Sequence, residues 1–160
     1  MPIYMKIPDV PGESLAAEYR DTIRVLDISW GLSRPGPPTA KPVFADIGIT
    51  KAIDLATTEL AKRAANGNSL GKCRIFNVLE GQPVREFQKI TTWKTRVTSL
   101  SQTDNESGGP PIEAVTFSFD KIELIYRLFD QTGMPVGTKR FAWDLINDQS
   151  FPAGAAGDVG

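Results

Sequence analysis

The side chains that most often do catalytic chemistry are scarce in this chain. Its 160 residues include no histidine, which removes the Ser-His-Asp and Cys-His arrangements and the usual zinc ligand. The one cysteine, Cys73, can form neither an intramolecular disulfide nor a tetrahedral metal site, so we interpret it as a small buried hydrophobic residue. The GxGxxG, GxxxxGKS/T and HExxH motifs are absent from the sequence.

Carboxylates are the remaining candidates for catalysis. The 19 Asp and Glu residues are spread along the chain, whereas carboxylate catalysis needs two such groups facing each other across a cleft. Spacing along the sequence cannot show such a pair, so the residues leave catalysis by carboxylates possible without pointing to it. Our prediction is a protein that is not an enzyme, with no catalytic residues, no cofactor and no metal.

The composition is that of one globular domain. Hydrophobic residues make up 41% of the chain and charged residues 23%, and 160 residues are enough for one core. A net charge of −1 with scattered basic residues argues against nucleic acid as a partner. No window approaches the ~20 apolar residues of a membrane span, and residues 1–14 lack the apolar run of a signal peptide. We expect synthesis and folding in the cytoplasm, without membrane insertion.

Alternation of apolar and polar residues predicts strands over most of the chain. The predicted strands are 3–7, 22–33, 43–50, 71–80, 84–102, 112–129 and 139–146. In the second of these, the packed face consists of Leu26, Ile28, Trp30 and Leu32, and the polar face includes Asp27 and Ser29. Each of Trp30, Trp93 and Trp143 falls on the apolar face of its strand, so we expect all three in the core. Trp93 and Val97 are predicted on one face.

The strand at 112–129 changes phase near Asp120-Lys121, which predicts a bulge or a bend between two strands. Its inward residues are predicted to be Val115, Phe117, Phe119, Ile122, Leu124, Tyr126 and Leu128. Prolines and glycines predict loops at 34–42 and 103–111. We expect one domain over residues 1–148 and a mobile C-terminal tail over 149–160.

One stretch, residues 53–69, has a helical period. Asp54 is the predicted N-cap, and Asn66-Gly67 is the predicted left-handed stop. The narrow apolar side consists of Ile53, Ala56, Leu60 and Ala64, and the charged side of Glu59, Lys62 and Arg63. Such a helix buries too little surface to stand alone, so we expect it to pack on the sheet. Together these elements predict a mainly β fold, a β-barrel with one short α-helix against it.

Several short motifs occur in the order found in one known family. They are Ile3–Lys6 with Gly12-Glu13-Ser14, then Ser29-Trp30-Gly31, Thr50-Lys51 with Ile53-Asp54 and Gly67, Ile90–Ser99, Val115–Tyr126 and Trp143-Asp144-Leu145. Over residues 2–148 the chain resembles the haemolysin-coregulated protein (Hcp) family, the tube protein of the bacterial type VI secretion system. It departs from the family pattern at RPGPPTAKP (34–42), Thr57-Thr58 and Gly67-Asn68-Ser69. The prolines predict a stiffer long loop than in other members.

The resemblance implies a ring-forming protomer, a β-barrel of two packed antiparallel sheets with the helix on the channel wall. Six protomers would form a ring, and stacked rings would form a tube expelled by an outer sheath. The partners implied are the protein itself, the sheath, spike and baseplate proteins, and effector proteins in the lumen. The protein would be secreted outside the cell or into target cells. The residues implied on the lumen wall, in contact with cargo, are Ser29, Asp27, Glu59, Lys62 and Arg63.

Other interpretations remain open at this point. The faces bearing Ser29 and the charged helix residues can be ordinary solvated surfaces. A stand-alone β-barrel holding a small ligand is one alternative function, although the bulky inward residues favour a filled barrel. A phage tail-tube-like protein is another, because fold alone does not fix the biological setting. Residues 149–160 are too few for a fused toxin domain. Edge strands are the expected source of the ring interface.

Overall fold

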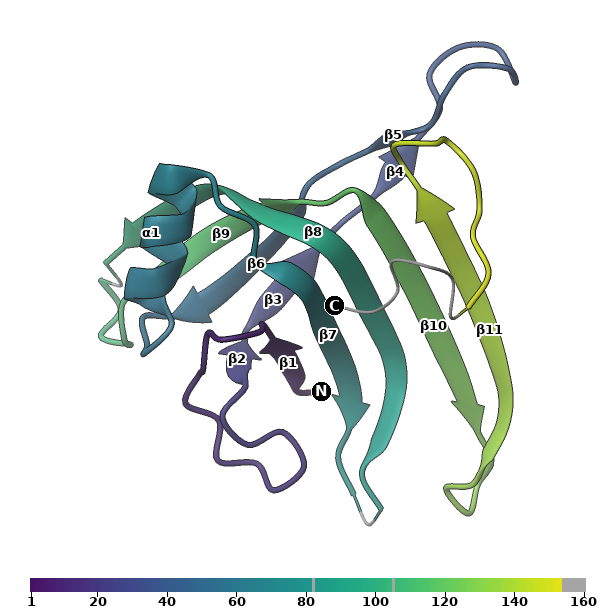
Figure 1. The fold of residues 1–160 in the computed structure, drawn as a ribbon. Helices are drawn as coiled ribbons and strands as arrows, with labels where there is room; N and C mark the ends of the chain where they lie inside the picture. Colours follow the sequence, from purple (N-terminus) through teal and green to yellow (C-terminus); the bar gives the residue numbers. More distant parts are fainter. Residues whose placement is uncertain (82, 105, 154–160) are drawn as a thin grey trace.

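Strands dominate the computed structural model, which describes residues 1–81, 83–104 and 106–153 (Figure 1). The elements in chain order are β1 (Ile3–Lys6), β2 (Ile23–Val25), β3 (Asp27–Ser29), β4 (Leu32–Ser33), β5 (Val43–Phe44), β6 (Ile47–Ala52), α1 (Thr57–Asn66), β7 (Gly71–Leu79), β8 (Arg85–Thr103), β9 (Ile112–Ser118), β10 (Lys121–Phe129) and β11 (Pro135–Asp144). The predicted mainly β fold with one short helix is confirmed.

Nine strands of the described residues form one antiparallel sheet, in the order β2-β1-β7-β8-β9-β6-β3, with β10 joined to β8 and β11 joined to β10. The sheet rolls around the core, with α1 packed against β8 (Figure 1). Hydrogen bonding does not close it into a barrel, because its order ends at β2 and β3. A separate pair, β4 with β5, carries the loop at 34–42, which projects away from the sheet.

A long strand, β8, turns the sheet. Its residues 88–93 pair with β10, and its residues 96–103 pair with β9. Between these parts Lys94 takes a left-handed backbone with φ 50°, and the β7–β8 register shifts between Gly71 and Cys73. The result is a β-bulge, which bends a strand and resets its alternation.

The bulge corrects one prediction from the sequence. Trp93 and Val97 lie on opposite faces, because the extra residue at Lys94 reverses the phase between them. Val97 belongs to the main hydrophobic core. Trp93 is buried too, but it pairs with Lys121 on the other face of β8 and β10, outside that core.

A second correction concerns the strand predicted at 22–33. Leu26 was predicted to face the core and is 54% exposed, whereas Val25 is buried. The alternation changes phase between β2 and β3 because the chain changes its pairing partner there: β2 pairs with β1, whereas β3 pairs with β6. The backbone N–H of Leu26 donates to the carbonyl of Thr50 at 2.7 Å in this crossing. Leu32 is also exposed, since it lies on the separate β4–β5 pair.

The predicted bend at Asp120-Lys121 is confirmed, because β9 ends at Ser118 and β10 begins at Lys121. The inward row is buried from Val115 to Ile122, and Leu124 packs against the core. Tyr126 and Leu128 were predicted inward as well, but they are 46% and 51% exposed. The β8–β10 register pairs end at Tyr126, so the end of the β10–β11 hairpin lies beyond this pairing.

The N-cap of the helix lies two residues later than the predicted Asp54. Ala56 occupies the N-cap position and makes no side-chain cap, while the Asp54 carboxylate accepts the Ala56 N–H at 2.9 Å in the preceding turn. Gly67 ends the helix with φ 74°, as predicted. Ala56 and Leu60 are buried in the core, whereas Ile53, predicted on the apolar side, is exposed.

Of the other predicted core residues, Trp30 and Trp143 are partly buried against the core and Cys73 is buried within it. Burial raises the pKa of the Cys73 thiol to about 12, so it stays protonated at neutral pH. Of the tail predicted to be mobile, Gln149 pairs with Asp144 and Phe151 lies against Trp93, and residues 154–160 lie outside the described residues. Among the described residues, no helix is long and apolar enough to cross a membrane.

The bulge at Lys94 leads to a stability prediction. We expect Lys94→Gly to change the free energy of unfolding by less than about 1 kcal/mol, because glycine adopts a positive φ without steric cost. Lys94→Val should lower it by about 1–3 kcal/mol, because a β-branched residue is strained there. Urea unfolding of both variants measures the difference. Equal stability of the two would contradict a left-handed residue at this position.

Candidate functional site

The exposed polar residues Asp27 and Ser29 lie on β3, at the edge of the sheet. The Cα partner of Ser29 across the strand pair is Gly48 on β6, and the next partner is Thr116 on β9. Glycine leaves this position open, since a Cβ on Gly48 would meet the Ser29 hydroxyl at 3.0 Å. A shallow hollow of about 230 Å³ results, lined by residues that include Asp27, Ser29, Gly48 and Thr116.

Hydroxyl groups continue across the neighbouring strands. The Thr116 hydroxyl hydrogen-bonds to the hydroxyls of Thr98 at 2.7 Å and Ser99 at 2.5 Å. The Thr98 hydroxyl donates a hydrogen bond to a carboxylate oxygen of Asp46 at 2.6 Å. We call Ser29, Thr98, Ser99 and Thr116 the hydroxyl face. Hydroxyls can both donate and accept, so this face can bind main-chain and side-chain polar groups of another protein.

The helix candidates form a different group. Glu59 and Arg63 make an (i, i+4) ion pair at 3.0 Å, and Arg63 also donates to the carbonyl of Ser69 at 2.5 Å. Lys62 is exposed. Among the contacts of the described residues, none joins these side chains to Asp27 or Ser29. The five residues proposed from the sequence therefore form two separate sets rather than one site.

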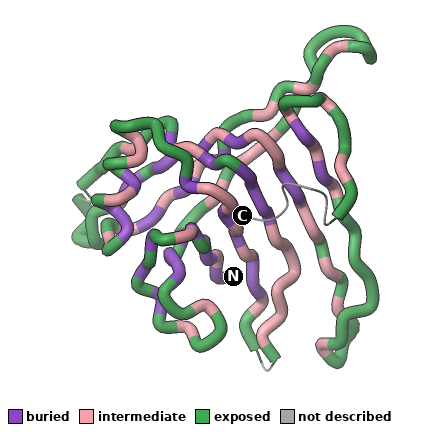
Figure 2. Tube along the Cα trace, viewed as in Figure 1, coloured by how far each residue is buried: buried purple, intermediate pink, exposed green. Residues whose placement is uncertain are grey.

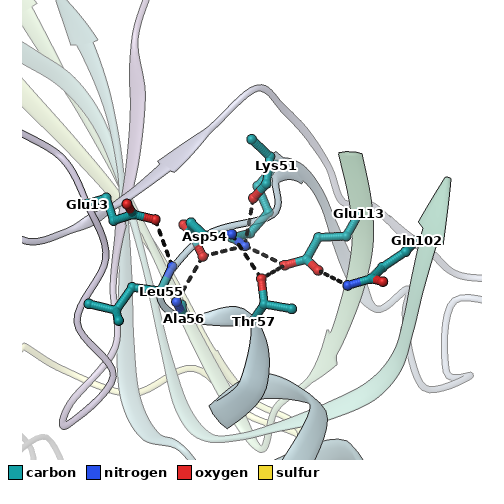
Figure 3. Close-up of polar contacts among 9 residues, drawn as sticks. Glu13, Lys51, Asp54, Leu55, Ala56, Thr57, Gln102 and Glu113 are labelled. Carbon is teal, nitrogen blue, oxygen red and sulfur yellow. Dashed lines mark hydrogen bonds and ion pairs between the residues drawn. The ribbon is translucent and has the colours of Figure 1, made fainter. Parts of the chain in front are cut away.

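A buried charge cluster that sequence reasoning missed joins the sheet to the helix (Figure 3). Lys51 on β6 is 0% exposed and forms ion pairs with Glu113 on β9 and with Asp54, the latter at 2.8 Å. Its ammonium also donates to the Ala52 carbonyl at 3.0 Å. All three hydrogens of the ammonium thus have an oxygen partner.

The acidic partner is equally well satisfied. Glu113 accepts the Thr57 hydroxyl at 2.9 Å on one oxygen and the Gln102 amide at 3.2 Å on the other. The Thr57 hydroxyl in turn accepts the Asp54 N–H at 3.0 Å (Figure 3). Thr57 is the first residue of α1, so the cluster fixes where the helix begins. In the described part of the chain, no group of acidic, His or Cys side chains is arranged to hold a metal ion.

The fold is shared with solved type VI secretion proteins. A structure described as a type six secretion system protein matches with TM-score 0.88 and 23% identity, over 94% of this chain and 99% of that one. Hcp1 from Salmonella typhimurium matches with TM-score 0.80 and 22% identity, over 94% and 98%. A type VI secretion system effector from Yersinia pestis matches with TM-score 0.74 and 22% identity, over 89% and 98%. At such identities the likeness establishes the fold.

The sequence itself establishes the family. A sequence model of the family described as "Type VI secretion system effector, Hcp" matches residues 4–126. The chain belongs to the Hcp family, as its motifs predicted, and its function is that of a type VI secretion tube protein. The family implies a secreted protein that assembles with itself and with effectors. The comparison with curated proteins gives no match.

The charge cluster leads to a second prediction. Lys51→Met should lower the free energy of unfolding by about 3–5 kcal/mol, because it leaves Glu113 buried without a countercharge. Lys51→Met combined with Glu113→Gln should cost less than the single change, since the amide oxygen can still accept from Thr57. Thermal and urea unfolding of both variants measure this. A double variant less stable than Lys51→Met would contradict the charge argument.

Proposed function

We propose that six copies of this protein close into a ring, that the rings stack into the inner tube of the type VI apparatus, and that effectors travel inside. On this proposal the protein works without catalysis or a cofactor. It is made in the bacterial cytoplasm, contacts sheath, spike and baseplate proteins, and is expelled through the apparatus.

The observation that supports self-assembly is an apolar row left uncovered on β10. Ile122 and Leu124 belong to the core side of this strand, and Tyr126 and Leu128 continue the same row into solvent. Figure 2 shows the far end of the β10–β11 hairpin largely exposed. Apolar side chains in a contiguous exposed row are typical of protein–protein contacts.

A ring also needs a second, different surface on each protomer, since head-to-tail contacts join unlike patches. The turn before α1 offers one, because Ile53 and Leu55 are exposed there. The Leu55 N–H donates to the Glu13 carboxylate at 2.8 Å, which brings the loop bearing exposed Leu15 to the same place. We therefore propose that the β10 row of one copy packs near this turn of the next.

The hydroxyl face supports a place for cargo. It is exposed, polar and slightly hollow, and its Ser29 occupies the position of the serine that the family resemblance puts on the lumen wall. Asp27 lies beside it on β3, and we include it in the cargo surface. Glu59, Lys62 and Arg63 are proposed as a second lumen-facing set on α1.

The assembly proposal predicts an effect of charge on the apolar row. Leu128→Asp should abolish rings while leaving the protomer folded, because an aspartate in the contact would have to be desolvated. Thr138→Asp is the matched control, since Thr138 is exposed on the other face of the same hairpin. Light scattering after size exclusion and negative-stain images measure the assembly. Six-protomer rings formed by Leu128→Asp would contradict this interface.

The cargo proposal predicts a separate effect. Ser29→Arg should leave rings intact and reduce co-purification of a cognate effector at least about tenfold, because a long cation fills the hollow beside Gly48. Ser33→Arg, which changes another exposed serine, on β4, is the control and should retain binding. Loss of rings in Ser29→Arg would instead place Ser29 at an interface between copies.

A further inference from the structure

The C-terminal segment turns back sharply after β11. Asp144 and Gln149 exchange two backbone hydrogen bonds, of 2.8 and 3.2 Å. The Asp144 carboxylate accepts the backbone N–H groups of Ile146 at 3.0 Å and Asn147 at 3.1 Å, and the Asn147 amide at 2.8 Å. Burial alone raises the pKa of Asp144, but these hydrogen bonds outweigh it and lower the pKa below its usual value. The turn therefore aims the following residues back at the sheet.

Phe151 then lies against the face of the sheet that does not cover the core. Its ring meets the Trp93 ring edge-on, with centroids 5.4 Å apart. The Lys121 ammonium lies 5.4 Å from the Phe151 centroid, and the Arg140 guanidinium carbon 5.3 Å from it. Arg140 also donates to the Phe151 carbonyl at 2.9 Å. The ring and the carbonyl of Phe151 are thus held by three residues, Trp93, Lys121 and Arg140, which we call the aromatic seat.

The seat is built from parts that the strands hold in place. Trp93 and Lys121 are register partners on β8 and β10, and Arg140 on β11 donates to Glu123 at 2.6 Å. Trp93 is 5% exposed although it lies outside the main core. Its indole N–H is buried, and no acceptor for it exists among the described residues. A hollow of about 550 Å³, lined in part by Arg140, Ala142 and Phe151, adjoins the seat.

We propose that the aromatic seat is a binding site for an aromatic residue on an extended peptide, filled by Phe151 of the same chain and able to take Phe151 of a second copy. Each group of Phe151 has a partner in the seat. Its ring packs edge-to-face with the Trp93 indole, the Lys121 and Arg140 cations lie over the ring, and its carbonyl accepts from Arg140. A second copy of the protein carries the identical C-terminal segment, so two copies can exchange these segments without forming any new type of contact. The proposal goes beyond the tube function and does not depend on ring formation.

Exchange is suppressed in an isolated protomer. A short tether gives its own Phe151 an effective concentration on the order of millimolar, so a free peptide competes only when that residue is removed. The test therefore uses the full chain with Phe151→Ala. Trp30→Phe and Trp143→Phe in the same chain leave Trp93 as the single tryptophan, and its fluorescence reports on the seat.

We expect Phe151→Ala to increase acrylamide quenching of Trp93 severalfold and to shift its emission to longer wavelength. Ser150→Ala, an exposed neighbour in the same segment, should leave both unchanged. Adding a peptide of residues 147–153 should then protect Trp93 from acrylamide again, with a saturable dependence on peptide concentration. The same peptide with alanine in place of phenylalanine should require at least about a tenfold higher concentration for the same protection. Unchanged quenching in Phe151→Ala would overturn the seat, and equal binding of the two peptides would overturn aromatic recognition.

A second measurement covers the case in which the tryptophan replacements prevent folding. Hydrogen exchange of residues 149–153 is followed in the chain with all three tryptophans. Phe151→Ala should speed exchange there at least about tenfold, whereas Ser150→Ala should not. Equal exchange in the two variants would overturn the proposal.

Discussion

The buried ion pair between Lys51 and Glu113 is the contact on which the arrangement of sheet and helix depends. A helix of ten residues is marginal alone, since isolated helices shorter than about 12–15 residues are unstable in water. Its buried side chains, Thr57 and Leu60, cover little surface. Lys51 and Glu113 hold the first residue of α1, Thr57, against β6 and β9, and a charge pair without exposure tolerates little displacement. The helix therefore stays over the core, where Leu60 fills the space beside β8.

The bulge at Lys94 has the complementary effect on the other half of the molecule. By turning β8 from β10 toward β9, it separates the hairpin of β10 and β11 from the part of the sheet that the helix covers. The same reversal of phase moves Trp93 off the core and onto the outer face. The position of Trp93 in the aromatic seat thus follows from one left-handed residue.

Alternation predicted the strands, the single helix, its glycine stop and the bend at Asp120, because each depends on neighbours in the sequence. It failed at Leu26, where the strand changes its pairing partner, and at Trp93, where a bulge reverses the alternation. It also failed at Leu128, which lies on the inward row but beyond the end of the core. The charge cluster left a signal that was not used. Lys51 follows Ile47 and Ile49 at period two, and Glu113 precedes Val115 and Phe117 in the same way. An inward lysine and an inward glutamate on paired strands predict a buried ion pair.

The free edge of β11 argues for contact through the face of the hairpin rather than through its backbone. The strand begins with Pro135, which has no N–H to donate, and continues with Lys139 and Arg140, all exposed. Prolines and cations on an edge oppose pairing with another strand, and the register shift next to Phe129 twists that edge further. Tyr126 and Leu128 on the adjacent strand have no such protection. A contact through these side chains can be limited to one geometry, as a closed ring requires, whereas open strand addition has no natural end.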